Sequence, residues 1–286
     1  MPETRQPDPS PQVAGLERVI SGSQSGRRRS ESCFQSIGDL GMLKAELHIH
    51  TGDDPVDLIP YSAHDLVDRA ADLGYDALAI TLHQRQLDLA PFRGHARERG
   101  IVLIPGVERT ICGKHVLLLN FPAAAERAQS FEEVVALKTR WPGLVIAPHP
   151  FYPTPSCLGR LLTRHAAVFD AVEFNYYYTR QINVFNEMAV RWSHAHGKPI
   201  VANADVHRLE QLGPTYTLID ADPDADAICF AIRAGRVAIR TEPISNITAV
   251  THLTGLAVGG LRGRARRWTA PRTVPADCTA LTRHTR

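Results

Sequence analysis

Seven short apolar runs, separated by segments of helical character, constrain the fold of this chain more than any other feature. They cover residues 43–48, 77–81, 101–105, 115–120, 144–148, 171–175 and 199–203. Each run has the length and the aliphatic content of a buried strand, and strands that alternate with helices favour a largely parallel α/β sheet. We therefore predict a distorted (β/α)7 TIM-like barrel followed by a small C-terminal α/β appendage.

Helix signals fill several of the gaps between these runs. Ser62 can cap a helix, and Asp65 stands three residues later, as in a capping box. Ser130 and Glu133 repeat that spacing before a second helix. A third helix has an apolar stripe at helical spacing, which predicts core packing. The stripe consists of Phe185, Met188, Ala189 and Trp192.

Histidines and carboxylates gather just beyond the strand-like runs. They are His48, His50, His83, Glu108, His115, His149, Asp205 and His207. The loops at the carboxyl ends of barrel strands lie at one end of the barrel, so they can bring such side chains together. His48 and His50 stand two apart on a strand, so both imidazoles point to one face. Converging imidazole and carboxylate ligands predict a site for zinc, manganese or iron.

His115 is the exception, because it opens its run instead of following it. Six residues separate it from Glu108. A hairpin-like excursion through Arg109–Lys114 would bring the two side chains back together.

Composition sets the boundaries of the folded part. Residues 1–41 are rich in Pro, Ser, Gly and Arg, which predicts a disordered extension, and Met42 is an alternative translation start. Residues 251–286 are predicted to be a basic, disordered tail. Residues 255–286 carry a net charge of +6 and leave −4 for residues 42–254, so the core does not resemble a nucleic-acid platform.

Two further patterns concern the cellular compartment. The sequence shows neither a long apolar membrane segment nor the apolar core of a signal peptide. The five cysteines are scattered and form no CxxC pair. We therefore expect reduced thiols and a cytoplasmic protein.

Six motifs stand in a diagnostic order along the chain. They are HIHT at 48–51, TLH at 81–83, GVE at 106–108, His115, APHP at 147–150 and ADVH at 204–207. The ordered set resembles the PHP (polymerase and histidinol phosphatase) family of metal-dependent phosphoesterases. The stretch Gly213–Glu242, which contains AIRAGRVAIR, is similar to the PHP-associated C-terminal region of stand-alone members. The resemblance implies a barrel over residues 42–212 and a PHP-associated region over residues 213–250.

The resemblance also implies a centre of two or three divalent metal ions, which are Mn, Zn or Fe. The ligands implied for the first ion are His48, His50, Glu108 and Asp205. Those implied for the second ion, which shares Glu108 as a bridge, are Glu108, His115 and His149. The residues expected to act in catalysis are Glu108, Asp205 and His207.

A third ion would use His83, His207 and a carboxylate that follows the HxH motif. Asp57 is the expected ligand and Asp54 is the alternative, because the loop length differs from the common pattern. Leu82 stands where the common TDH motif has an aspartate. A ligand or a supporting hydrogen bond of the third site is therefore expected to be missing.

The expected activity is hydrolysis of a small phosphorylated metabolite or nucleotide, because clustered divalent ions lower the pKa of water and stabilise in-line displacement. Arg85, Arg180 and Arg208 each follow a strand-end motif and are the expected phosphate-binding residues. Two alternatives stay open. One is an amidohydrolase-like, metal-dependent hydrolase, and the other is a catalytically silent, metal-stabilised binding module. The expected partner is a small phosphorylated substrate, with no membrane and with nucleic acid only as a short nucleotide.

Overall fold

A computed structural model gives the structure of the protein and describes residues 41–252. In chain order the elements are β1 (Leu43–Ile49), α2 (Ala63–Asp72), β2 (Ala77–Ile80), α3 (Arg93–Glu98), β3 (Val102–Ile111), β4 (Lys114–Leu119), η1 (Ala123–Arg127), α4 (Phe131–Arg140), β5 (Leu144–Ala147), α5 (Arg160–Arg164), β6 (Ala171–Asn175), α6 (Val184–His196), β7 (Ile200–Asn203), η2 (Leu209–Gln211), β8 (Thr215–Ile219), α7 (Ala225–Arg233) and β9 (Val237–Thr241). The expectations of disorder at residues 1–41 and 251–286 fall almost entirely outside the described residues.

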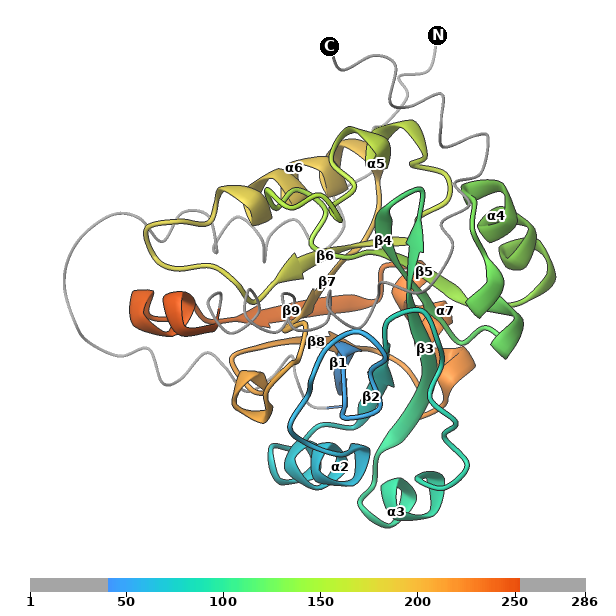
Figure 1. Cartoon of the computed structure of the whole chain (residues 1–286), viewed down its shortest axis with the longest axis vertical. Helices are drawn as coiled ribbons and strands as arrows, with labels where there is room; N and C mark the ends of the chain where they lie inside the picture. Colours follow the sequence, from blue (N-terminus) through green and yellow to red (C-terminus); the bar gives the residue numbers. More distant parts are fainter. Residues whose placement is uncertain (1–40, 253–286) are drawn as a thin grey trace, which may run out of the picture. The chain divides into compact units, whose positions relative to one another are not determined.

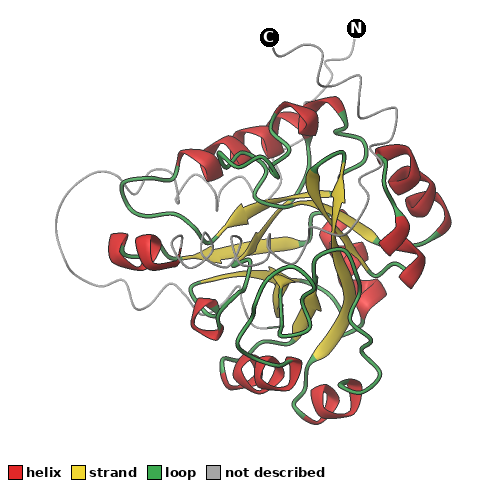
Figure 2. Cartoon of the chain, viewed as in Figure 1, coloured by secondary structure: helices red, strands yellow, loops and turns green. Residues whose placement is uncertain are grey.

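Within residues 41–252, nine strands form one mixed sheet in the order β7-β6-β5-β4-β3-β2-β1-β8-β9 (Figures 1 and 2). Strands β1 to β3 are parallel to one another, and so are β5 to β7. Strand β4 runs antiparallel to both of its neighbours. The nearly closed, barrel-like sheet confirms the predicted fold class, and the reversal of β4 is its distortion.

Strands β3 and β4 form a hairpin with Cys112 and Gly113 in the turn. Both turn residues have positive φ, 51° at Cys112 and 76° at Gly113, and glycine adopts such a backbone without strain. The register places Thr110 opposite His115. This hairpin is the excursion predicted from the spacing of Glu108 and His115.

The barrel closes between β1 and the segment that follows β7. The N–H of Val206 donates to the carbonyl of His48 at 2.9 Å, and the N–H of His50 donates to the carbonyl of Val206 at 3.0 Å. The side-chain oxygen of Asn203 accepts the N–H of Leu47 at 3.3 Å. These bonds fix the HxH motif against the turn after β7.

An irregularity in β1 lies next to the HxH motif. The register of β1 against β2 shifts between Glu46 and Ile49. The hydroxyl of Thr81 accepts the N–H of Ile49 at 3.0 Å and donates to its carbonyl at 3.2 Å, beside a backbone bond of 2.7 Å from the N–H of Thr81 to the same carbonyl. Bulges of this kind re-aim side chains beside active sites.

Two buried apolar clusters support the sheet. One joins inward-facing strand residues with Ile228 and Ile232, so α7 packs against the barrel strands. The other includes residues of α2 and β2 and contains Leu82, which is fully buried. Figure 1 shows α2 and α3 beside β1 to β3, and α6 beside β6. Leu82 is thus a core residue.

The helix caps largely follow the sequence. Ser62 and Asp65 form the predicted capping box of α2. The Ser130 hydroxyl accepts the N–H of Glu133 at 3.2 Å, but the Glu133 carboxylate turns to the N–H of Gln129 at 2.6 Å, so the second box is incomplete.

The predicted core stripe of α6 is wrong at Met188, which is 37% exposed. The physical reason is Asn186, which is buried and exchanges two hydrogen bonds of 2.9 Å with the backbone of Asn175 in β6. This polar contact turns the side of α6 that carries Asn186 toward the sheet and leaves Met188 outside.

Two of the described cysteines, Cys157 and Cys229, are free and buried. Cys112 is disulfide-bonded, which corrects the expectation of reduced thiols at that position; it lies in the β3–β4 turn, where its side chain is partly exposed. Across residues 41–252, every helix is too short or too polar to span a membrane.

Candidate metal centre

A cavity of about 210 Å³ opens near the carboxyl ends of the barrel strands. Its lining includes seven predicted site residues, which are Asp57, His83, Glu108, His115, His149, Asp205 and His207. The remaining two predicted ligands, His48 and His50, are fully buried and lie within ligand range of Asp205. The structure therefore brings all nine predicted metal-ligating residues into one cluster.

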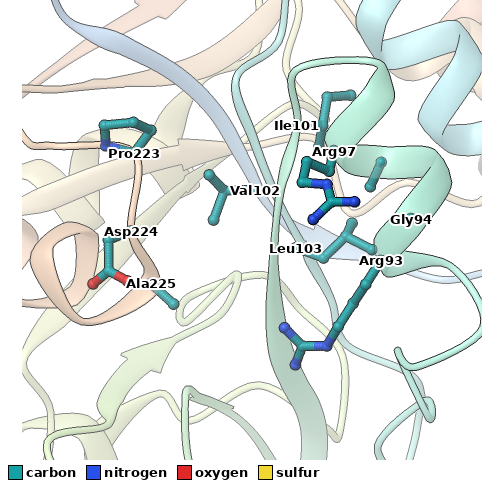
Figure 3. A pocket seen from close by; sticks show the side chains of 10 residues that line it. Arg93, Gly94, Arg97, Ile101, Val102, Leu103, Pro223, Asp224 and Ala225 are labelled. Carbon is teal, nitrogen blue, oxygen red and sulfur yellow. The ribbon is translucent and has the colours of Figure 1, made fainter.

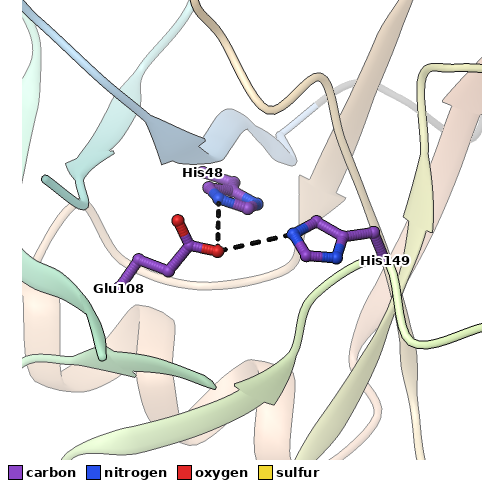
Figure 4. Close-up of side chains that lie close together, drawn as sticks. All are labelled: His48, Glu108 and His149. Carbon is purple, nitrogen blue, oxygen red and sulfur yellow. Dashed lines mark ion pairs between the residues drawn. The ribbon is translucent and has the colours of Figure 1, made fainter. Parts of the chain in front are cut away.

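Ligand atoms in this cluster form four overlapping groups, and within each group they lie within 4.8 Å of one another. The groups are His48–Glu108–His149, His48–His50–Asp205, His50–Asp54–His83 and His83–Glu108–His115. Figure 4 shows the first of them, with the Glu108 carboxylate between the imidazole of His48, which lies on β1, and that of His149, which lies in the loop after β5. The overlap is typical of ions that share ligands rather than of separate sites.

Glu108 lies at the centre of the cluster and is almost fully buried. Its oxygens face nitrogens of five imidazoles, which belong to His48, His50, His83, His115 and His149. Oε1 is 2.6 Å from His115 and Oε2 is 3.0 Å from His83, so different imidazoles contact the two oxygens. Burial alone would raise the pKa of Glu108, but His115, His83 and His48 outweigh it and hold the pKa well below its usual range.

The buried Nε2 atoms of His48 and His50 have no hydrogen-bond partner among the described residues. They lie 3.2 and 3.4 Å from Oδ1 of Asp205. Donor atoms bound at 2.0–2.1 Å to a tetrahedral ion are about 3.3 Å apart, so these distances fit a shared metal ion. A bound cation would also satisfy buried nitrogens that are otherwise costly to leave unpaired.

A carboxylate contacts Nδ1 of each imidazole in the HxH motif. Nδ1 of His48 is 2.9 Å from Glu173, and Nδ1 of His50 is 2.8 Å from Asp54. A proton on Nδ1 leaves the Nε2 lone pair free for a metal. Burial acts to lower the pKa of His50, but the nearby carboxylates of Asp205 and Asp54 outweigh it and raise the pKa to about 9.

Asp54 and Asp57 have different environments. One Asp54 oxygen contacts the Nδ1 atoms of His50 and His83 at 2.8 and 3.0 Å, and the other accepts the N–H of Asp57 at 2.9 Å. Asp54 lies within ligand range of both imidazoles, yet its oxygens are already used for orientation. Asp57 lines the cavity, 3.3 Å from Nε2 of His207. Asp54 belongs to a described group of potential metal ligands and Asp57 does not, so the choice of Asp57 as the ligand stays a prediction.

Two ligands lie on strained backbone. His149 has φ of 29° and Asp205 has φ of 51°, a region that non-glycine residues rarely adopt. Strain of this kind persists only where surrounding contacts hold it, and it concentrates at functional sites. The pKa of Asp205 lies far below its usual range, because His48 and His207 outweigh the effect of burial.

The predicted phosphate-binding arginines do not line the cavity. Arg85, Arg180 and Arg208 are all exposed, and Arg85 donates to the carbonyl of Asp53 at 3.0 Å. Among the described residues, no arginine or lysine belongs to the lining. Their role in substrate binding stays a prediction.

Five further lining residues were not predicted from the sequence. They are Tyr152, Thr154, Ser156, Cys157 and Tyr177. Asn175 also lines the cavity and ends β6, two residues after Glu173 on the same strand. All follow or end strands β5 and β6, so the rule that strand-end loops build the site could have found them. Cys157 lies 3.3 Å from Nδ1 of His149; burial would raise the pKa of its thiol, but this contact outweighs burial and lowers it.

A larger cavity of about 410 Å³ lies elsewhere, beside α3 and the start of β3 (Figure 3). Its lining residues are Arg93, Gly94, Ala96, Arg97, Ile101, Val102, Leu103, Pro223, Asp224 and Ala225. None of them belongs to a described group of potential metal ligands. Size alone therefore does not make it the functional site.

A comparison with family models finds a match in part of the chain. Residues 183–237 match the family described as PHP-associated, which overlaps the predicted region 213–250 and begins earlier. A search of curated proteins found no match.

Solved structures share the fold. A two-domain protein of Bacteroides vulgatus containing a predicted PHP-like metal-dependent phosphoesterase is 18% identical, with a TM-score of 0.57 over 82% of this chain and 75% of that one. PsfC from Pseudomonas syringae is 15% identical, with a TM-score of 0.54 over 79% and 99%. The lesion-specific endonuclease EndoQ from Pyrococcus furiosus is 16% identical, with a TM-score of 0.50 over 82% and 74%. The order of the ligand motifs thus resembles the PHP family, the PHP-associated match covers residues 183–237, and the solved structures show that this chain shares their barrel fold.

Proposed function

We propose that this chain is a metal-dependent phosphoesterase whose His/Asp/Glu cluster holds two or three divalent ions. The observation that carries the proposal is the central position of Glu108, whose carboxylate belongs to two overlapping ligand groups. The partnerless, buried Nε2 atoms of His48 and His50 support it. Manganese, zinc and iron all suit such a donor set.

Divalent ions held in such a cluster lower the pKa of water and neutralise charge on phosphate oxygens. Glu108 belongs to two groups of potential ligands, so this residue could hold two ions in fixed relation. Asp205 presents Oδ1 to both imidazoles of the HxH motif. His207 is hydrogen-bonded through Nδ1 to the Asp205 carbonyl at 2.9 Å and through Nε2 to Asp57 at 3.3 Å, so both of its nitrogens are engaged at the cavity wall.

The proposed substrate is a small phosphorylated metabolite or nucleotide. The cavity of about 210 Å³ suits a phosphoryl group with little more, and Thr154, Ser156 and Tyr177 offer hydroxyls at its wall. Arg85, Arg180 and Arg208 remain candidates for contacts with the part of the substrate outside the cavity. We place the proposed enzyme in the cytoplasm.

A second candidate is hydrolysis of a phosphodiester in nucleic acid. The fold shared with a lesion-specific endonuclease favours it, although the sequence favours a short nucleotide at most. The net charge of −4 over residues 42–254 weighs against extended contact with a nucleic-acid backbone.

The test compares substrates on one preparation of protein. Purified protein is analysed for bound metals and then assayed with manganese on p-nitrophenyl phosphate, bis-p-nitrophenyl phosphate and a damaged DNA duplex. We expect metal-dependent turnover of a small ester. Turnover of the duplex alone would favour the second candidate. Metal binding without turnover on a broad phosphoester panel would instead support the silent binding module.

A further inference from the structure

We infer that Glu173 is a positioning residue that orients ligands of two different metal positions at once. The inference rests on the proposed metal centre and extends it to a residue beyond the ligand set. Glu173 lies on β6, is fully buried and is not a member of any described ligand group. Its role would be to fix His48 and His149 through one carboxylate.

Four donors satisfy the two oxygens of Glu173. Oε2 is 2.9 Å from Nδ1 of His48 and accepts from the amide of Asn203 at 3.0 Å. Oε1 accepts the backbone N–H of His149 at 3.0 Å and the amide of Asn175 at 2.7 Å. A carboxylate with only donors around it is held in one orientation, and it orients its donors in return.

The contact with His48 decides which nitrogen faces the metals. A proton on Nδ1 that is donated to Glu173 leaves the lone pair on Nε2, and Nε2 lies 3.2 Å from Asp205 and 3.5 Å from Glu108. Carboxylates behind metal-binding histidines fix the tautomer and the ring angle in this manner.

The contact with His149 acts on the backbone instead. His149 has φ of 29°, and its N–H donates to Glu173. This bond helps to hold a conformation that is otherwise unfavourable. Nε2 of His149 then lies 3.4 Å from Oε1 of Glu108, whereas His83 contacts Oε2.

The two asparagines prevent Glu173 from adapting. The side-chain oxygen of Asn203 accepts the N–H of Leu47, and that of Asn175 accepts the N–H of Tyr177 at 3.0 Å. Each amide group must therefore point its NH₂ toward Glu173. A glutamine at position 173 would have one NH₂ group, and in either orientation of the amide this group would face two donors. Of these four donors, only His48 can respond by moving its proton to Nε2, which removes the metal-binding lone pair.

The test uses Glu173→Gln with Asp170→Asn as the matched control. Asp170 is a buried carboxylate directly before β6 and accepts from the N–H of Val145 at 2.9 Å and from Lys138 at 2.8 Å, away from the metal centre. Manganese affinity is measured by titration calorimetry, and folding by thermal unfolding. We expect Glu173→Gln to fold and to lose about 10- to 100-fold in manganese affinity. Asp170→Asn should lower Tm and leave the affinity unchanged.

A second measurement needs no variant. In zinc-loaded wild-type protein, long-range ¹H–¹⁵N spectra should place the remaining ring proton of His48 on Nδ1. A proton on Nε2 would overturn the inference even if Glu173→Gln failed to fold. Equal manganese affinity in wild type and folded Glu173→Gln would also overturn it. Wild-type protein that binds no divalent ion would defeat the proposed function itself, which is a separate outcome.

Discussion

The imidazoles around Glu108 are used through both of their nitrogens. His48, His50 and His83 each direct Nδ1 to a buried carboxylate and Nε2 toward the cavity side of the cluster. A ring anchored through Nδ1 is restricted in its rotation, so the positions of the Nε2 ligand atoms are largely set before a metal binds. The affinity for a metal ion should therefore depend on the carboxylates that contact Nδ1 as well as on the imidazoles themselves.

Replacing the central carboxylate tests its bridging role. Glu108→Gln exchanges a two-oxygen anion for one weak oxygen ligand and an NH₂ group that repels metal. We expect a loss of at least about 10²-fold in turnover on a phosphomonoester at saturating manganese. Circular dichroism checks the fold, and Glu187→Gln on the outer side of α6 serves as the control. Equal turnover of a folded Glu108→Gln would rule out the bridge.

Removal of the HxH pair tests the ligand assignment. Wild-type protein is expected to carry at least about two transition-metal equivalents, and His48→Ala with His50→Ala should strip most of them, because two ligands of one ion are lost together. Elemental analysis measures the metal content. The control is His64→Ala with His95→Ala, a neighbouring pair outside the cluster whose rings are 5.3 Å apart. Full metal retention in the first double variant would contradict the assignment.

The raised pKa of His50 predicts how metal binding depends on pH. In metal-free protein its pKa is about 9, above the value of about 6.5 in an unfolded chain. The resulting stability is complete below pH 6.5 and is lost as the pH rises toward 9. A metal needs the unprotonated nitrogen, so its apparent affinity should rise over the same range.

Thermal unfolding with and without manganese measures this effect. The difference in Tm between the two forms should widen from pH 6.5 to pH 8.5. His50→Asn, which cannot titrate, should make the difference less dependent on pH. A difference that stays constant or narrows in the wild type would contradict the prediction.

Among the elements, those with a local cause were predictable. The seven barrel strands follow from apolar runs, the cap of α2 from Ser62 and Asp65, and the hairpin from six residues between two ligands. Met188 could not be placed correctly, because the side of α6 that faces the sheet is chosen by the distant Asn175. The site shows the same division. Its candidate ligands stand in recognisable motifs, whereas the contacts of Asp54 with His50 and His83 form only once the chain has folded.

The cap of α2 gives a test of an element without a role in the site. Ser62→Ala removes the acceptor for the N–H of Asp65 and should lower stability by about 1 kcal/mol. Chemical denaturation measures this change, and metal content should not change, because α2 supplies none of the ligand groups. An unchanged midpoint would show that the cap contributes nothing, and lost metal would show that α2 positions the site.

At the scale of the whole molecule, both apolar clusters lie within the described range 41–252. We predict that deletion of residues 1–41 and 260–286 leaves folding and activity nearly intact. In contrast, a truncated chain that ends at residue 224 lacks Ile228 and Ile232 of the barrel cluster, so it should fail to fold. Solubility, circular dichroism and phosphatase activity compare the two forms. An unfolded product of the first deletion would refute the prediction.

The closure of the barrel has a consequence for the order in which the site assembles. Glu108 and His115 share one hairpin, so their half of the cluster forms from neighbours in sequence. The HxH half depends on bonds from Leu47 and Ala204 that span 156 and 158 residues. Long-range contacts form late because the loop they close costs the most entropy. A divalent ion added during refolding should thus bind tightly only at the last step. The rate of its uptake should therefore report the rate at which the barrel closes.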